Sequence, residues 1–396
     1  MVQDDFSSSY NTITFPVYVM ARSAGSKCNL DCIYCKKKQP NQDEEEPAEM
    51  NRQILEKFIR QYIDAQIHSA VRFFWAGGEP LLCGIDFYKE ALQLQRKMGA
   101  GKHITNTVQT NAVLLDNEWC SFLKENEFQV NVTLDGPRHC HDRYRVKPDG
   151  AGSFDDVMRG ISLLRKYGIP FQIKATINDY NVQYPLETYR FFKTNGFRHI
   201  QFIPHISLED GHLSEWSVPA LSYGNFLCTI FDEWVRNDVG QMFISIFENT
   251  LKIFCRREAI NCMYAPTCGH SAMADSNGDI YTCNYFFLPE HRLGNINDQT
   301  ITGMMYGRKQ LRFGQQKRSS LSVQCKRCNY LRLCNGGCMK DRIGNSLTGE
   351  KHHNILCAGY QKFFSHVSPA MIFMAEEIAG GGNSSRVMSF FETCQD

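Results

Sequence analysis

The sequence lacks a strong charge of either sign. Of its 396 residues, 43 are Lys or Arg and 42 are Asp or Glu, so the formal net charge is +1. Proteins that capture nucleic acids or anionic membrane surfaces electrostatically carry an excess of basic residues. The balanced charge therefore argues against a nucleic acid partner and against an electrostatically held membrane surface.

The sequence also lacks segments that would export or anchor it. Its amino terminus has no signal-peptide pattern of a basic region, an apolar run and a small-residue cleavage site, and no apolar run is long enough to cross a bilayer. Seventeen cysteines without a secretory signal favour metal–sulfur ligation in a reducing compartment over a disulfide framework. We therefore expect a cytoplasmic protein without a membrane partner.

From residue 16 to about 205, short β-branched or aromatic runs alternate with amphipathic stretches. The expected strands are residues 17–21, 71–75, 105–109, 130–134, 171–176 and 199–204. The expected helices between them are residues 51–66, 86–97, 117–126, 154–167 and 185–194. Six β–α repeats predict parallel strands with right-handed crossovers, and so a partial (β/α)6 TIM-like barrel of the α/β class. In such barrels the functional residues follow the strands.

A cysteine triplet follows the first expected strand. Cys28, Cys32 and Cys35 are spaced C-x3-C-x2-C, and Tyr34 precedes the third cysteine. A [4Fe-4S] cluster is normally held by four thiolates, so three leave one iron open to a non-protein ligand. A zinc knuckle is the alternative for this spacing alone. The pattern resembles the radical SAM superfamily signature, which implies that S-adenosylmethionine binds the open iron and yields a 5′-deoxyadenosyl radical.

Glycine and polar residues follow the next strands. The pair Gly77-Gly78 allows a close approach of the backbone to a ligand, and Glu79 adds a carboxylate. The radical SAM resemblance implies that these three residues and Tyr34 bind the cofactor. It also implies that Thr133 and Arg145 contact the ribose and the carboxylate of the cofactor.

The same residues have plainer interpretations. A Gly-Gly pair is also an ordinary turn signal, and Asp135-Gly136-Pro137 reads as a turn. Arg143 and Arg145 would suit a solvated surface pair. His141 is expected to be a hydrogen-bonded structural residue rather than a ligand.

Eight more cysteines follow with regular spacing, as Cys262-x5-Cys268-x14-Cys283 and Cys325-x2-Cys328-x5-Cys334-x3-Cys338-x18-Cys357. Eight thiolates are the number that two fully ligated [4Fe-4S] clusters need. Two zinc ribbons are the alternative, but the amino-terminal triplet favours iron–sulfur. The spacing resembles the SPASM extension of radical SAM enzymes. That resemblance implies a first auxiliary cluster on Cys262, Cys268, Cys283 and Cys338, and a second on Cys325, Cys328, Cys334 and Cys357.

Six cysteines lie outside these groups and are expected to be buried or surface thiols: Cys83, Cys120, Cys140, Cys228, Cys255 and Cys394. The expected domains are a tail (1–15), the radical SAM partial barrel (16–205), a helical bridge (206–260), the SPASM domain (261–360), and a carboxy-terminal helix and tail (361–396). The bridge should contain helices 223–237 and 243–256, and the last segment a helix over 363–378. Asn277-Gly278 predicts a hairpin turn within the SPASM domain.

Beyond the cysteines, residues 17 to about 374 resemble the anaerobic sulfatase-maturating enzymes. The supporting stretches include Tyr223-Gly224-Asn225-Phe226-Leu227 and Cys334-Asn335-Gly336-Gly337-Cys338. The resemblance implies oxidation of a Cys or Ser side chain of a sulfatase to Cα-formylglycine. It further implies S-adenosylmethionine and three [4Fe-4S] clusters as cofactors. The implied partners are a peptide or protein substrate and a flavodoxin- or ferredoxin-type electron donor.

Three positions depart from the pattern of that family and are the catalytic candidates. Asn284 stands where the family carries an Asp regarded as the proton acceptor, Lys37 where Tyr is typical, and Ala76 where Gln or His is usual. An amide cannot accept a proton at neutral pH as a carboxylate does. We therefore expect a peptide maturase with a changed pocket that crosslinks side chains of a ribosomally made precursor, with formylglycine formation as the alternative.

Overall fold

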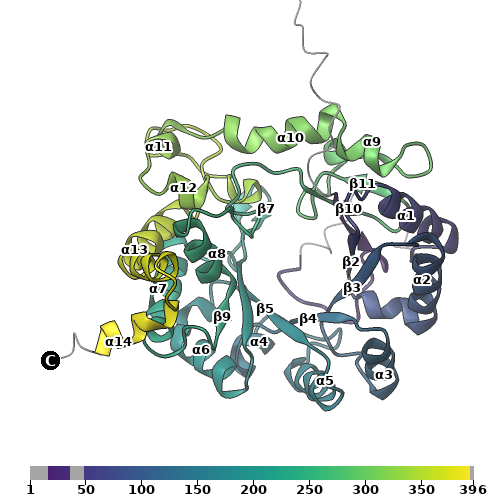
Figure 1. Ribbon diagram of the computed structural model, residues 1–396, viewed down its shortest axis with the longest axis horizontal. Helices are drawn as coiled ribbons and strands as arrows, with labels where there is room; N and C mark the ends of the chain where they lie inside the picture. Colours follow the sequence, from purple (N-terminus) through teal and green to yellow (C-terminus); the bar gives the residue numbers. More distant parts are fainter. Residues whose placement is uncertain (1–16, 36–48, 393–396) are drawn as a thin grey trace, which may run out of the picture. The chain divides into compact units, whose positions relative to one another are not determined.

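The computed structural model describes residues 17–35 and 49–392, which divide into two compact units. The first unit comprises residues 17–27, 49–107 and 269–314, and the second comprises residues 28–35, 108–268 and 315–392. The chain passes from the first unit to the second within strand β3 (His103–Thr110) (Figure 1). Lys37 and Cys394 lie outside the described residues.

A sheet with the strand order β12-β11-β10-β1-β2-β3 forms the centre of the first unit. Its strands β1 and β2 run parallel, as do β1 and β10, whereas β10, β11 and β12 are antiparallel. The bounds are β1 (Tyr18–Arg22), β2 (Ala70–Ala76), β10 (Ser271–Ala274), β11 (Asp279–Tyr281) and β12 (Arg292–Asn295). The helical elements are α1 (Arg52–Asp64), η2 (Pro80–Cys83), α2 (Gly84–Met98), η4 (Pro289–His291), α9 (Ile301–Met305) and the start of α10 (Arg308–Ser319).

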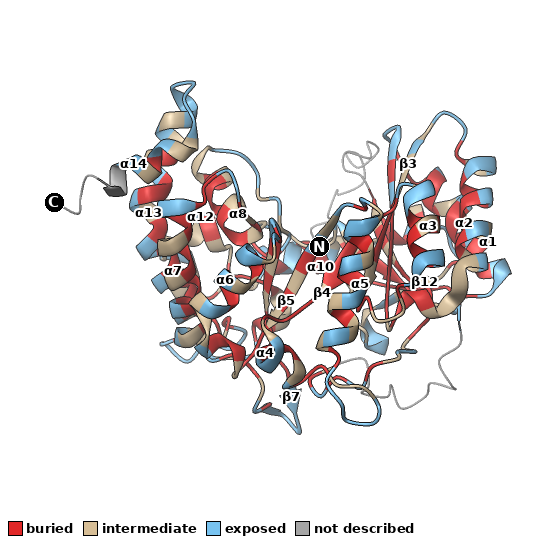
Figure 2. Ribbon diagram, turned by 90° about the horizontal axis from the view of Figure 1, so that it is seen from below, coloured by how far each residue is buried: buried red, intermediate tan, exposed pale blue. Residues whose placement is uncertain are grey.

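Helix α1 shows why this sequence forms an amphipathic helix. Asn51 caps its first turn, because its side chain accepts a hydrogen bond from the Ile54 amide at 3.0 Å. The apolar residues recur at helical spacing and are buried, namely Ile54, Leu55, Phe58, Ile59, Tyr62 and Ile63. Figure 2 shows the same division in α1 and α2, where buried and exposed residues alternate along each helix. The buried stripe holds α1 in the core of this unit.

The second unit contains the parallel strands β4, β5, β6 and β9, in that order. The bounds are β4 (Gln129–Thr133), β5 (Phe171–Ile177), β6 (His199–Pro204) and β9 (Phe243–Ile244), with a separate hairpin of β7 (Leu208–Glu209) and β8 (His212–Leu213). The first helices are α3 (Asn117–Glu125), α4 (Arg138–Asp142), α5 (Phe154–Lys166), η3 (Asn181–Gln183), α6 (Pro185–Thr194), α7 (Ala220–Asn237) and α8 (Ser245–Phe254). The later ones are α11 (Val323–Lys326), α12 (Leu331–Cys334), η5 (Met339–Asp341), α13 (Cys357–Ala379), η6 (Ser384–Arg386) and α14 (Val387–Glu392).

The predicted β–α alternation is confirmed at all six expected strands and five expected helices, with ends shifted by a few residues. The predicted hairpin at Asn277-Gly278 joins β10 to β11. The bridge was predicted to be helical, and it contains the two expected helices as α7 and α8, but also the strands β7, β8 and β9. These strands have two residues each, too few to show an alternating pattern. Among the described helices, none has the length and apolar character to cross a bilayer.

Helices α7 and α13 lie side by side in the second unit (Figure 1). Their close approach depends on two glycines. A Cβ on Gly224 would lie 2.6 Å from the Gly359 carbonyl oxygen, and a Cβ on Gly359 would lie 2.0 Å from the Ala220 oxygen. Any larger residue would therefore push the helices apart.

We expect Gly224→Ala to destabilise the protein, because the added methyl meets backbone that cannot move without displacing α13. Overpacking of this kind costs about 1–3 kcal/mol. Thermal unfolding followed by circular dichroism measures the effect. Gly380→Ala is the matched control, because a Cβ there would meet atoms no closer than 3.5 Å. Equal melting temperatures for the two variants would contradict the close packing.

Candidate functional site

The cysteine triplet occupies a loop whose backbone amides donate hydrogen bonds to the segment around Val146. Within the second unit, the Asp31 amide donates to the Val146 carbonyl at 2.8 Å and the Ile33 amide to the Tyr144 carbonyl at 2.9 Å. Burial raises the pKa of Cys32 to about 11, and Cys35 and Cys28 raise it further while Arg145 lowers it. The three thiols thus lie close enough to act on one another, as ligands of one cluster must.

Tyr34 is tied to the segment that follows β4. Its hydroxyl donates to the Asp135 carboxylate and accepts from Arg145 Nη1 at 3.1 Å. The other oxygen of Asp135 accepts from the Thr176 amide at 2.9 Å. Asp135 is fully buried; burial raises the pKa of its carboxyl, whereas Arg145 and the Tyr34 hydrogen bond oppose that rise. This carboxylate therefore anchors the cluster loop to the strand ends.

The plainer interpretations, which made Asp135 a turn residue and Arg145 a surface residue, did not predict these hydrogen bonds with Tyr34. Arg145 is 8% exposed, and its buried Nε has no hydrogen-bond partner in the described structure. A free donor on a buried guanidinium suits a carboxylate ligand, as expected for the methionine end of S-adenosylmethionine. Thr133, the last residue of β4, is half-buried at the same strand end.

His141 is a structural residue, as predicted. Its Nδ1 lies 3.3 Å from the Asp135 amide and its Nε2 lies 3.0 Å from the Ser153 hydroxyl, which in turn donates to the Arg145 carbonyl at 2.7 Å. Burial lowers the pKa of His141 well below its usual value, and Arg145 lowers it further. The neutral ring therefore holds the segment that carries Asp135 and Arg145.

In the first unit, the Gly-Gly pair permits a close approach of backbone to backbone. The Gly78 amide donates to the Gly25 carbonyl at 2.9 Å, and a Cβ on Gly78 would lie 1.8 Å from the Lys27 oxygen. The prediction of a close approach to a ligand therefore describes only part of what these glycines do. The buried Glu79 side chain accepts from the Leu81 amide at 3.1 Å and caps η2.

Ala76 belongs to a small apolar cluster of the first unit. It is buried with Phe74 and Met273, and Tyr18, Met20 and Phe287 pack against them. A buried ion pair lies beside Ala76 in the sheet. Arg22, which pairs with Ala76 in register, bonds Asp275 at 3.2 Å and lies over the Phe287 ring at 4.3 Å. No local pattern indicates this pair, because Arg22 and Asp275 are 253 residues apart.

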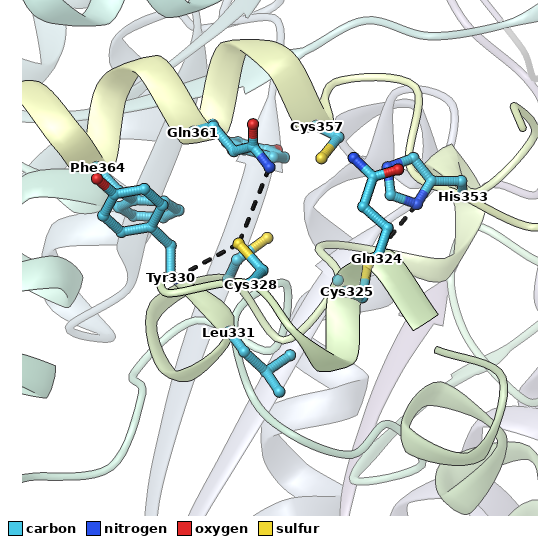
Figure 3. Close-up of a pocket in the computed structure, with 12 residues that line it drawn as sticks. Gln324, Cys325, Cys328, Tyr330, Leu331, His353, Cys357, Gln361 and Phe364 are labelled. Atoms are coloured by element: carbon cyan, nitrogen blue, oxygen red, sulfur yellow. Dashed lines mark hydrogen bonds between the residues drawn. The ribbon is translucent and has the colours of Figure 1, made fainter. Parts of the chain in front are cut away.

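Four of the predicted ligand thiols surround one pocket of the second unit. Cys325, Cys328, Cys334 and Cys357 all line it. Figure 3 shows the Gln361 side chain directed at Cys328. The Cys328 sulfur accepts from the Gln361 side-chain amide at 3.9 Å and from the Tyr330 backbone amide at 3.4 Å. Burial raises the pKa of Cys334 to about 12, and the other three thiols raise it further. The set is the one predicted for the second auxiliary cluster.

His353 is a neighbour of this pocket that the sequence analysis missed. Its Nδ1 lies 3.7 Å from the Cys325 sulfur (Figure 3) and 3.1 Å from the Ser322 hydroxyl. Donors directed at cluster sulfurs adjust the reduction potential of a cluster. A histidine four residues before Cys357 carries no such signal in the sequence.

Three of the four thiols predicted for the first auxiliary cluster lie together in the second unit. Cys262 raises the pKa of both Cys268 and Cys338, in addition to the larger effect of burial. Cys283 belongs to the first unit, where its thiol donates to the Asn284 side-chain oxygen at 3.3 Å. Its membership of this ligand set therefore stays a prediction, as do the roles of Asn284 and Ala76.

Comparisons with known proteins place two domains on the chain. The family model of the radical SAM superfamily matches residues 23–192, and that of the SPASM iron–sulfur cluster-binding domain matches residues 267–329. These matches confirm the predicted fold class. They also support S-adenosylmethionine, a radical SAM cluster and auxiliary clusters as the cofactors, which the thiol groups described above fit.

The chain is similar to curated enzymes over nearly its whole length. It is 42% identical to a serine-type anaerobic sulfatase-maturating enzyme of Bacteroides thetaiotaomicron, over 96% of this chain and 97% of the relative. It is 30% identical to a cysteine-type enzyme of Clostridium perfringens, over 92% of this chain and 99% of the relative. The solved structure of native anSMEcpe with bound AdoMet and Cp18Cys peptide matches at a TM-score of 0.84 with 29% identity, covering 92% of this chain and 99% of that one.

We expect replacement of Cys28, Cys32 and Cys35 together by Ala to remove about four of about twelve irons, because one of three four-iron clusters is lost. Metal analysis of the anaerobically reconstituted protein measures iron and zinc. Cleavage of S-adenosylmethionine should disappear with the cluster. Cys228→Ala, a buried thiol outside the groups, is the control. Unchanged iron in the triple variant, or zinc in place of iron, would refute the assignment.

Asp135→Asn should destabilise the protein more than Tyr34→Phe does. Removing the carboxylate leaves the buried Arg145 charge without its counter-ion, a change that typically costs about 3–5 kcal/mol. The Phe substitution removes one hydroxyl, which costs about 1 kcal/mol. Denaturant unfolding midpoints of the two variants give the order. A midpoint for Asp135→Asn at or above that of Tyr34→Phe would show that Asp135 does not anchor the loop.

Proposed function

Because this chain belongs to the family of anaerobic sulfatase-maturating enzymes, we propose that it oxidises a side chain of a sulfatase polypeptide to Cα-formylglycine. The supporting observation is the 42% identity to a serine-type enzyme, which extends over 96% of this chain. This similarity favours sulfatase maturation over the crosslinking of a precursor peptide that the pocket substitutions suggested. The partners would be the polypeptide substrate and a flavodoxin- or ferredoxin-type electron donor.

The residues that match the radical SAM pattern would prepare the reaction. When bound, S-adenosylmethionine and its cluster supply a deoxyadenosyl radical that takes a hydrogen atom from the substrate β-carbon. Cys28, Cys32 and Cys35 would hold that cluster. The unpartnered Arg145 Nε would bind the cofactor carboxylate, and the Gly77–Glu79 segment would bind its amino group. Tyr34 and Thr133 would complete the cofactor contacts.

The substrate side chain must then lose one electron and one proton to reach the oxidation level of an aldehyde. A serine gives the aldehyde directly, whereas a cysteine gives a thioaldehyde, which water converts into the aldehyde with release of hydrogen sulfide. The electron would pass to the auxiliary clusters, whose full cysteine ligation leaves no open iron. The proton is the harder step, because Asn284 replaces the carboxylate that the family uses. The Asn284 side-chain oxygen accepts a hydrogen bond from Cys283, but an amide does not take up a proton at neutral pH.

This substitution favours a cysteine over a serine as the target residue. A free thiol has a pKa of about 8.5, so it releases its proton to water without a dedicated base. An alcohol holds its proton far more tightly and depends on a positioned base. We therefore propose that the enzyme acts on the cysteine form of a sulfatase motif. The chain is more similar to the serine-type relative than to the cysteine-type one. The preference for cysteine is therefore argued from position 284 and not from overall similarity.

The test compares sulfatase-motif peptides in Cys and Ser forms, incubated with reconstituted enzyme, S-adenosylmethionine and reductant, and analysed by mass spectrometry. We expect aldehyde from the Cys peptide, at a rate that rises from pH 7 toward 8.5 as the thiol ionises. The Ser peptide should react at least about 100-fold more slowly, because a positioned general base contributes about 10²–10⁴-fold to the rate. Asn284→Asp should raise Ser turnover and flatten the pH dependence.

Asn297→Asp is the control, because Asn297 accepts from Lys57 in the first unit and its replacement adds the same charge outside the pocket positions. Equal Ser turnover in the unmodified enzyme and in Asn284→Asp would exclude the proposed role of position 284. Deoxyadenosine release without aldehyde from either peptide would reject formylglycine formation. The substrate to test would then be a precursor peptide that loses two hydrogens per crosslink.

A further inference from the structure

One short segment of the second unit carries a thiol of each auxiliary group. Cys334 lines the pocket of the second group. Four residues later, Cys338 lies near the first group, because Cys262 of that group raises the pKa of Cys338. The residues between them, Asn335, Gly336 and Gly337, have φ of 47°, 72° and 64°. We call residues 334–338 the crossover segment. Glycine adopts this left-handed conformation without steric cost, whereas Asn335 adopts it at a cost in energy unless its surroundings hold it.

Arg342 provides that support. Its guanidinium donates from Nε to the Gly336 carbonyl at 3.1 Å and from Nη2 to the Asn335 carbonyl at 2.9 Å. On its other side, Nη1 donates to the Lys317 carbonyl at 2.7 Å and to the Ser320 hydroxyl at 3.1 Å. A Cβ on Gly336 would lie 2.6 Å from Nη2, so glycine is required for this contact. The side chain is buried, and it joins the crossover segment to the end of α10.

The charge of Arg342 faces thiols of both groups. All four of its hydrogen-bond acceptors are neutral oxygens, and the neighbouring Asp341 carboxylate pairs with Lys340 at 2.5 Å. Burial lowers the pKa of the guanidinium. Thiols of the second group (Cys325 and Cys334) and of the first group (Cys268 and Cys338) oppose that shift. Arg342 therefore lies within electrostatic range of both cluster sites.

Lys317 is a second buried cation, and it lies against the first group. Its Nζ donates to the Cys262 carbonyl at 2.8 Å and to the Met263 carbonyl at 2.9 Å, and its residue is fully buried. Burial lowers the pKa of its amine, and three thiols oppose this, all of them from the first group: Cys268, Cys338 and Cys262. The two cations thus differ in which thiols they face.

We propose that Arg342 fixes the crossover segment and raises the reduction potentials of both auxiliary clusters, whereas Lys317 raises that of the first cluster alone. Reduction adds one electron to a cluster that already carries net negative charge, so a fixed cation nearby stabilises the reduced form. Both residues would make the clusters better acceptors of the electron that leaves the substrate. The inference rests on the cluster assignment within the proposed function, and it is independent of which side chain is oxidised.

The test is an EPR-monitored redox titration in a Cys28, Cys32 and Cys35→Ala background, which retains only the auxiliary clusters. We expect Arg342→Gln to lower both potentials, by about tenfold in each reduction equilibrium, which is about 59 mV for one electron. Lys317→Met should lower one potential and leave the other unchanged. Arg342→Lys should keep both potentials close to those of the parent, because the charge remains. Arg318→Gln, which removes an exposed charge next to Lys317, should change neither potential.

Iron content separates the possible failures. Parent protein without auxiliary iron would reject the cluster assignment itself. Full iron and parent potentials in both Arg342→Gln and Lys317→Met would overturn the electrostatic role. An equal shift of both potentials in Lys317→Met would overturn the division between the two cations. If Arg342→Gln retains no iron, the role in fixing the segment is supported, and Lys317→Met together with Arg342→Lys decides the electrostatic role.

Discussion

The structure depends on holding several thiolate ligands in positions where burial disfavours their negative charge. Burial raises the pKa of Cys32 to about 11 and those of Cys334 and Cys338 to about 12, so these groups stay protonated thiols until iron replaces the protons. Loading of the clusters must therefore release protons and contribute to folding. Each thiol group then concentrates negative charge in a poorly hydrated place. A buried cation beside each group offsets that charge, and the chain supplies Arg145, Lys317 and Arg342 for this purpose.

The cations can offset the charge of the thiolates because hydrogen bonds hold their side chains at fixed positions. Arg145 is held through Tyr34 and Asp135, and the same hydrogen bonds hold the cluster loop. Arg342 is held by oxygens of the crossover segment and of α10, and it fixes that segment in return. Glycines complete these supports where backbone must approach closely, as Gly78 does against Lys27. Ligand placement and charge compensation are thus achieved by the same side chains, so mutation of one affects both.

The sequence was most informative where a pattern repeats or a spacing is fixed. The alternation of strands and helices gave the β–α order, and the spacing of eleven cysteines gave the ligand groups, ten members of which lie in the second unit. It was least informative where a role depends on a distant partner. Asp135 resembled a turn residue because its partner Tyr34 is 101 residues away, and nothing near Arg22 pointed to Asp275. Strands of two residues, such as β9, show no periodicity at all. The grouping of Cys283 came from resemblance alone, and the structure assigns that residue to the other unit.

The chemistry that we propose requires three removals from the substrate: a hydrogen atom, an electron and a proton. The chain is well equipped for the first two, with thiols for three clusters and cations that favour electron acceptance. It is poorly equipped for the third, since the side chain after Cys283 is the amide of Asn284. An enzyme with strong oxidising capacity and little capacity for proton transfer is best suited to a substrate that ionises by itself. Among the two side chains oxidised by this family, only the cysteine thiol does so near neutral pH. The loss of one carboxylate can therefore narrow the substrate range while the radical machinery remains the same.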